Sequence, residues 1–263
     1  MSPTSLTAPR VPRAVTLTLW CLLVPALAVP GYLALGALLS LLTAGDSVMA
    51  MVALGAVAFV LVLVLRAARP SWFAIDTAPA GLPRIGGRRG TAPLLVAGQV
   101  LLAFLAGQSM ALTAYLLIGS DGFDSFNGLE QEHSALLLLA MTLLAAPLGE
   151  EALFRGTIYP LLRRRVGIWA SALVTTSVFA LVHGNIVQIL SALPLALLLA
   201  VLYERTRSLW LCVAAHIGFN VAANVVPVAV IAPLVNPPMA IALGTAAAWQ
   251  VVVLARQEPA AQS

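Results

Sequence analysis

The 263-residue sequence has no lysine, only two cysteines and few charged residues of either sign. Only 9% of the residues are charged, against about a quarter in soluble globular domains, which excludes a water-soluble domain. The 61% of hydrophobic residues exclude an intrinsically disordered chain. Cys21 and Cys212 both lie in apolar runs, so the sequence offers neither a disulfide framework nor a cysteine-rich zinc site. We interpret both as small core residues.

What the sequence contains instead is long apolar runs. Runs of about 17 to 25 residues can cross a bilayer as helices. Eight are present, and they predict an all-α, polytopic membrane helix bundle of about eight transmembrane helices, a single integral membrane domain over residues 1–263. We place them at residues 14–38, 47–65, 94–118, 134–162, 168–182, 186–203, 209–226 and 228–254. For the first run, a signal peptide cleaved after residues 26–28 is the alternative.

The 14 arginines are distributed unevenly along the chain. Thirteen precede the first run, follow the last or lie in every second loop, whereas the other loops carry acidic residues and no arginine. Cytoplasmic loops of bacterial membrane proteins collect basic residues. We therefore predict a multi-pass protein of a bacterial-type plasma membrane, with both termini and a basic loop over residues 66–93 in the cytoplasm. Since these arginines act as topological anchors, the net charge of +4 indicates no nucleic-acid partner.

The fourteenth arginine, Arg155, lies inside the fourth run together with Glu150 and Glu151. Ionisable side chains near the middle of a membrane helix cost about 2.5 to 3.5 kcal/mol each by insertion scales, and they usually mark a functional site. Glu151 and Arg155 are four residues apart and share a helix face, with the acid first, which favours an ion pair. Glu150 points about 100° away and is free to act as a general base. Tyr159 continues the Glu151–Arg155 face and could bond to either residue.

Polar residues on two further runs complete the candidate site. His183 ends the fifth run with Phe179 one turn before it, and His216 lies in the seventh run with Asn220 one turn after it. Polar groups inside a membrane need partners, so we expect these residues to meet in the bundle interior. We interpret the third histidine, His133, as a solvated residue of an acidic loop.

The candidate residues lie at different depths along their runs. At about 1.5 Å per residue, Glu150 is about 20 Å from the arginine-rich end of its run, whereas His216 is about 10 Å from the corresponding end. Convergence therefore requires tilted or broken helices. Prolines that could produce such breaks are Pro147, Pro160 and Pro194.

Together these residues form three motifs: EExxxR at Glu150, Glu151 and Arg155, FxxxH at Phe179 and His183, and HxxxN at His216 and Asn220. In this order and in separate apolar runs, the motifs resemble those of the CPBP family of intramembrane proteases. That family includes the type II CAAX prenyl endopeptidases and the bacterial Abi proteins. The resemblance covers a core of about residues 134–226.

The resemblance implies a hydrolase, an intramembrane CAAX-type endopeptidase. Its partners would be the lipid bilayer and a membrane-associated or lipidated protein or peptide substrate. It assigns the activation of a water molecule to Glu150 and His183, and the stabilisation of the oxyanion to His216 and Asn220. The second acid and the arginine of the first motif would order the helix that carries Glu150.

Several alternatives stay open from the sequence alone. Glu150, His183 and His216 could ligate a catalytic zinc, but no His-Glu-x-x-His helix is present, and we favour a metal-free, glutamate-type mechanism over a metalloprotease. The chain could instead be a non-catalytic bacteriocin self-immunity or scaffold protein. A proton-coupled transporter using Glu150 and Glu151 is less favoured, because no inverted repeat is present. The sequence does not determine the oligomeric state.

Overall fold

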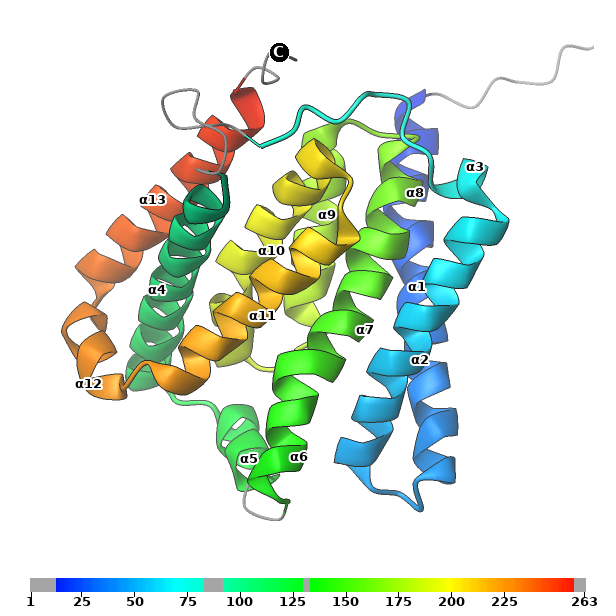
Figure 1. The fold of residues 1–263 in the computed structure, drawn as a ribbon. Coiled ribbons are helices and arrows are strands. Elements are labelled where there is room, and N and C mark those ends of the chain that lie inside the picture. Colours follow the sequence, from blue (N-terminus) through cyan, green and yellow to red (C-terminus); the bar gives the residue numbers. More distant parts are fainter. Residues whose placement is uncertain (1–12, 83–91, 130–132, 258–263) are drawn as a thin grey trace, which may run out of the picture.

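The computed structural model describes residues 13–82, 92–129 and 133–257, and every regular element in these segments is a helix, which confirms the predicted all-α class. Six helical segments are long and apolar enough to cross a membrane, and Figure 1 shows them gathered in one bundle. They are α1 (Arg13–Leu42), α2 (Ser47–Ala68), α4 (Ala92–Ile118), the composite segment Ala135–Arg163, α10 (Ile186–Thr206) and α13 (Pro237–Arg256).

The last predicted span differs from its expected form. α11 (Leu209–Val225) is followed by the segment Val228–Leu234, which contains α12 (Val228–Ile231), and the two are bent by 100°. The prediction of one span over residues 228–254 is therefore wrong at its start, since α13 begins only at Pro237. Proline lacks an amide hydrogen and suits the first turn of a helix better than its interior.

The number of crossings is close to the predicted eight. Six segments meet the length requirement, and the bent pair gives a seventh if it is one span. The remaining apolar helix, α9 (Ile168–Leu181), has 14 residues and is shorter than a usual span of about 20 residues.

The composite segment Ala135–Arg163 carries the paired glutamates and is not a uniform α-helix. Its parts are α6 (Ala135–Ala140), the π-helical turn η2 (Met141–Ala145), α7 (Ala146–Leu153), the π-helical turn η3 (Phe154–Ile158) and α8 (Tyr159–Arg163). Pro147 and Pro160 stand in the first turns of α7 and α8, directly after the two π turns. Two of the three prolines that predict a break thus coincide with one, whereas Pro194 lies inside the continuous α10.

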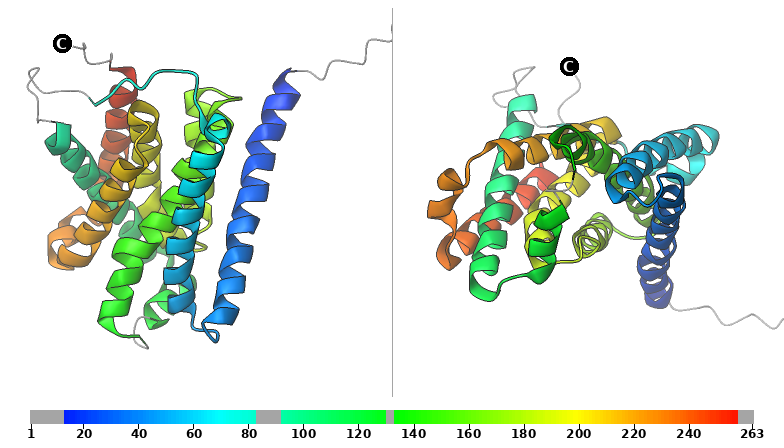
Figure 2. Two further views of the ribbon diagram at one scale, coloured as in Figure 1. Left: turned by 45° about the vertical axis from the view of Figure 1, so that its right-hand side comes forward. Right: turned by 90° about the horizontal axis from the view of Figure 1, so that it is seen from below.

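Most arginines of the described residues lie at one end of the bundle. α1 begins and α2, α8, α10 and α13 end at one end of the bundle (Figures 1 and 2). We call this the arginine end. The arginines there whose side chains the structure describes are Arg66, Arg69, Arg163, Arg164, Arg165, Arg205, Arg207 and Arg256. The acidic residues Asp46, Asp121 and Asp124 lie on elements at the opposite end, before α2 and in α5 (Asp121–Leu129). The predicted charges Arg10, Arg84, Arg88, Arg89, Glu130 and Glu132 lie outside the described residues.

Two close helix contacts position the site. α10 is the most buried of the spans and packs extensively on α4, whereas α1 lies at the edge of the bundle and is the least buried (Figure 2). α2 and α7 touch through their backbones, because a Cβ placed on Gly149 would lie 2.8 Å from the Cα of Gly55. Small residues allow such close approach between membrane helices. Glu150 therefore directly follows a residue of this backbone contact between α2 and α7.

Candidate active site

Glu151 and Arg155 form the predicted ion pair in the interior of the protein. Arg155 Nη1 lies 3.1 Å from Glu151 Oε1, and neither side chain is exposed. Arg155 Nη2 donates to the carbonyl of Ala196 on α10 at 2.6 Å, and its guanidinium carbon lies 5.0 Å from the ring centroid of Phe179 on α9. Arg155 thus joins three helices, and its charge is compensated where water cannot solvate it.

The same oxygen of Glu151 also binds His216. His216 Nδ1 lies 2.9 Å from Glu151 Oε1. Because this carboxylate is paired with Arg155 and accepts hydrogen bonds, we assign the ring proton to Nδ1, which leaves Nε2 with a free lone pair. Nε2 faces Glu150, at 3.9 Å from its Oε2. The first and third motifs therefore meet directly.

Glu150 points away from the ion pair, as its position on the helix predicts. Its side chain is 22% exposed, whereas that of Glu151 is fully buried. Oε2 of Glu150 is buried and has no hydrogen-bond partner among the described residues. A buried carboxylate oxygen without a partner is costly in a protein interior, so Glu150 is the acid of the pair suited to bind a further group.

His183 approaches the cluster through Phe179. Its Nδ1 lies 2.8 Å from the carbonyl oxygen of Phe179. A carbonyl can only accept, so Nδ1 carries the proton and Nε2 is the free nitrogen. The Phe179 ring centroid lies 5.2 Å from that of His183 and 5.8 Å from that of His216. The second motif thus stands beside the third, with one aromatic ring in contact with both histidines.

Asn220 is held by the π turn that precedes the glutamates. Its Nδ2 donates to the carbonyl of Thr142 at 2.7 Å. This carbonyl is available because the amide of Ala146 donates to Met141 one residue earlier, and Pro147 has no amide hydrogen. The local backbone irregularity therefore fixes the amide side chain of the third motif.

Two minor predictions need correction. Tyr159 bonds neither Glu151 nor Arg155, because η3 winds more widely than an α-helix and turns Tyr159 away; its hydroxyl donates to Glu204 Oε2 at 2.9 Å. His133 is partly buried rather than fully solvated, with Nε2 3.5 Å from Asp46 Oδ1.

A catalytic zinc would need three protein ligands, for which the sequence offers Glu150, His183 and His216. Across residues 13–82, 92–129 and 133–257, no group of three or more His, Cys, Asp or Glu side chains is placed to hold a metal ion. Glu150, His183 and His216 thus do not form a three-ligand set in this arrangement, in which Nδ1 of each histidine is already bonded within the protein.

One residue near the site has no signal in the sequence. Tyr32 belongs to α1, more than 100 positions before the glutamates, and nothing in its apolar run marks it. Its hydroxyl lies against Gly149, so that a Cβ at position 149 would be 2.6 Å from it, and it interacts electrostatically with Glu150. Sequence spacing cannot reveal this contact, because it depends on how α1 packs beside α2 and α7.

Comparisons with known proteins agree with the three motifs. Residues 132–222 match the family model described as "Type II CAAX prenyl endopeptidase Rce1-like", and this segment contains all three motifs. A Bacillus subtilis (strain 168) protein named "Putative membrane peptidase YdiL" is 24% identical over 126 residues, which is 48% of this chain and 52% of that protein. The chain therefore matches about half the length of this relative. No solved structure matches the chain significantly.

Proposed function

We propose that this multi-pass membrane protein, whose residues 132–222 match the Rce1-like family model, is an intramembrane endopeptidase of a bacterial-type plasma membrane. Its substrate would be a membrane-associated or lipidated, CAAX-like protein or peptide. The observation that carries the proposal is the meeting of Glu150, Glu151 and His216. Nε2 of His216 lies 3.9 Å from the otherwise unpartnered Oε2 of Glu150 and is oriented by Glu151.

Glu150 is the proposed general base. A water molecule bound to its free oxygen would lose a proton to the carboxylate while its oxygen attacks the carbonyl carbon of the scissile peptide bond. We assign to Nε2 of His183 the role of a second acceptor for that water. The protonated acid would then deliver the proton to the leaving amine, so that one water is consumed and an acid and an amine are released.

His216 and Asn220 are the proposed stabilisers of the oxyanion. Asn220 Nδ2 uses one hydrogen for Thr142 and retains a second for the substrate. His216 becomes a donor at Nε2 when it is protonated, and the Glu151 carboxylate on Nδ1 stabilises this imidazolium, as the acid of a catalytic triad does. Donors fixed in this way need little reorganisation during the reaction.

The test is cleavage of lipidated and unlipidated peptides by the detergent-solubilised protein. We expect Glu150→Gln to lower the cleavage rate by about 10²- to 10⁴-fold, the usual contribution of a general base. Asp76→Asn, at an exposed position in the loop between α2 and α4 at the arginine end, is the matched control and should cleave like the wild type. Undiminished cleavage by Glu150→Gln would contradict the mechanism. A cellular phenotype that survives Glu150→Gln would instead favour the non-catalytic alternative.

A second experiment with a chelator distinguishes the metal-free mechanism from the zinc-dependent one. Because we assign the chemistry to the side chains themselves, incubation with a zinc chelator should leave the cleavage rate unchanged. Loss of activity with the chelator and its return on addition of zinc would overturn the metal-free form and leave the endopeptidase assignment intact.

A further inference from the structure

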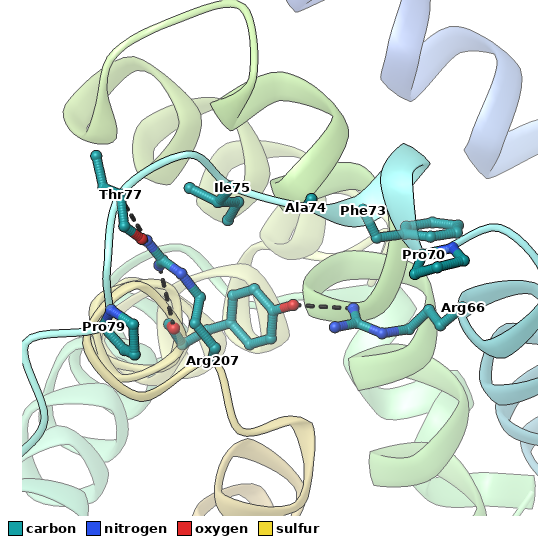
Figure 3. A pocket seen from close by; sticks show the side chains of 9 residues that line it. Arg66, Pro70, Phe73, Ala74, Ile75, Thr77, Pro79 and Arg207 are labelled. Atoms are coloured by element: carbon teal, nitrogen blue, oxygen red, sulfur yellow. Dashed lines mark hydrogen bonds between the residues drawn. The ribbon is translucent and has the colours of Figure 1, made fainter.

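A second polar centre lies at the arginine end of the bundle. A cavity of about 270 Å³ opens between the end of α2, the short helix α3 (Pro70–Phe73), the segment 74–82 and the end of α10. Its walls include Arg66, Phe73, Thr77, Tyr203 and Arg207, shown in Figure 3. The proposed peptidase chemistry uses none of these residues.

The walls of the cavity are held in place by hydrogen bonds. The amide of Gly81 donates to the carbonyl of Arg205 at 2.8 Å, and Arg205 Nε donates back to Gly81 at 2.9 Å. Arg205 is 3% exposed and also donates to the carbonyls of Leu254 and Gln257. Segment 74–82 is therefore tied across the ends of α10 and α13, so the cavity is preformed.

The two wall arginines keep unused donors. Arg66 donates from Nη1 to Tyr203 Oη at 2.9 Å and to the carbonyl of Gly156 at 3.2 Å, but its other nitrogens have no partner among the described residues (Figure 3). Arg207 Nη2 donates to Thr77 Oγ1 at 2.9 Å, while its Nε is buried and has no partner in the described segments. The buried donor of Arg207 requires an acceptor, and the free donors of Arg66 are open to a ligand.

Positive charge exceeds negative charge around the cavity. Glu204 accepts from Arg163, Arg207 and Tyr159. One carboxylate thus serves two guanidinium groups, and Arg66 has no acidic partner among the described residues. Asp76, on segment 74–82, is exposed and is not a wall residue. The cavity therefore favours an anion.

We propose that this cavity binds the phosphate group of an anionic phospholipid. Guanidinium groups match the geometry of phosphate oxygens. The cavity lies at the end of the bundle, where headgroups are found, next to Trp72, whose side chain is 53% exposed as in an interfacial anchor. Basic pockets at the ends of transmembrane helices suit anionic headgroups. A volume of about 270 Å³ admits a headgroup but not an acyl chain.

The test measures the thermal unfolding midpoint of the purified full-length protein in detergent, titrated with phosphatidylglycerol, phosphatidylcholine or inorganic phosphate. A ligand that binds only the folded state raises the midpoint with concentration. We expect phosphatidylglycerol to raise the midpoint half-maximally at a concentration at least about tenfold lower than phosphatidylcholine or inorganic phosphate. Arg66→Gln should raise the half-maximal concentration of phosphatidylglycerol about tenfold, as the loss of one charged hydrogen bond implies. Arg69→Gln is the matched control and should shift it less than about twofold.

Ala74→Phe provides a variant that keeps every arginine. Ala74 lines the cavity, so the larger side chain should abolish the effect of phosphatidylglycerol while the midpoint without lipid stays near the wild-type value. This variant decides the matter if Arg66→Gln does not fold. Equal responses to phosphatidylglycerol and phosphatidylcholine, or equal losses in Arg66→Gln and Arg69→Gln, would overturn the proposal. A full response to inorganic phosphate alone would assign the site to free phosphate and overturn the lipid.

Discussion

At the scale of single residues, the candidate site depends on one oxygen atom. Glu151 Oε1 accepts from Arg155 at 3.1 Å and from His216 Nδ1 at 2.9 Å, while Oε2 has no partner among the described residues. This carboxylate thus compensates the fully buried guanidinium of Arg155 and also selects the tautomer of His216. Loss of the Glu151 carboxylate should therefore affect both stability and catalysis. Loss of the Glu150 carboxylate should affect catalysis alone, because Glu150 is partly exposed and makes no side-chain hydrogen bond to a described residue.

The substitution Glu151→Gln tests whether this carboxylate contributes to both stability and catalysis. It leaves the Arg155 charge buried without a counterion, and breaking a buried pair in this way costs about 3–5 kcal/mol. We expect a clearly lower unfolding midpoint, together with loss of cleavage. The double variant Glu151→Met, Arg155→Met removes both charges and should recover much of the stability but no activity. Wild-type stability of Glu151→Gln would show that the pair contributes little.

Helical spacing predicts some of these contacts and fails for others. It correctly places Arg155 beside Glu151 and turns Glu150 away. It fails for Tyr159, because the π turn η3, which contains Arg155, ends just before Tyr159, and no residue type marks a π turn. The catalytic roles of the six site residues stay predictions until the variants are measured.

At the scale of elements, the two prolines of the composite span create acceptors that other helices use. Pro160 has no amide hydrogen for the carbonyl of Gly156, which accepts from Arg66 of α2 at 3.2 Å instead. At the other π turn, the carbonyl of Thr142 accepts from Asn220 of α11 at 2.7 Å. The prolines are visible in the sequence, but the partners are not, since they depend on which helices become neighbours.

The contact between α2 and α7 yields a prediction for Gly149. In Gly149→Ala the new Cβ would lie 2.8 Å from the Cα of Gly55, and backbone cannot move aside as a flexible side chain can. We expect α7 to shift, with a loss of about 1–3 kcal/mol in stability and reduced cleavage, because Glu150 is the next residue. Thermal unfolding and peptide cleavage measure the two effects.

Gly98→Ala is the matched control for this prediction. Gly98 also lies within a membrane helix, α4, but a Cβ there would meet no atom within 4 Å. Alanine should be tolerated or slightly stabilising at this position, because it restricts the unfolded chain. Equal effects of the two substitutions would mean that the close approach of α2 and α7 does not constrain the site.

At the scale of the whole molecule, the all-α class and the gathering of arginines at one end of the bundle could be predicted from the sequence. Which helices become central and which lie at the edge could not. α10 is the most buried span and α1 the least, yet both are almost entirely apolar in sequence. Lipid chains are as apolar as leucine, so hydrophobicity does not distinguish a central helix from a lipid-facing one. The break between α12 and α13 could be predicted from the sequence only in part, from Pro237 and Pro238.

The orientation in the membrane is the remaining prediction for the whole molecule. Ser71 lies in α3 at the arginine end and Ser125 in α5 at the opposite end, and both side chains are exposed. In a protein with Cys21 and Cys212 replaced by alanine, a membrane-impermeant maleimide should label Ser125→Cys on intact spheroplasts but Ser71→Cys only after lysis, because basic ends face the cytoplasm. The cysteine-free protein should stay unlabelled. Labelling of Ser71→Cys alone before lysis would invert the orientation, and labelling of both variants would contradict a fold whose two ends lie on opposite sides of the bilayer.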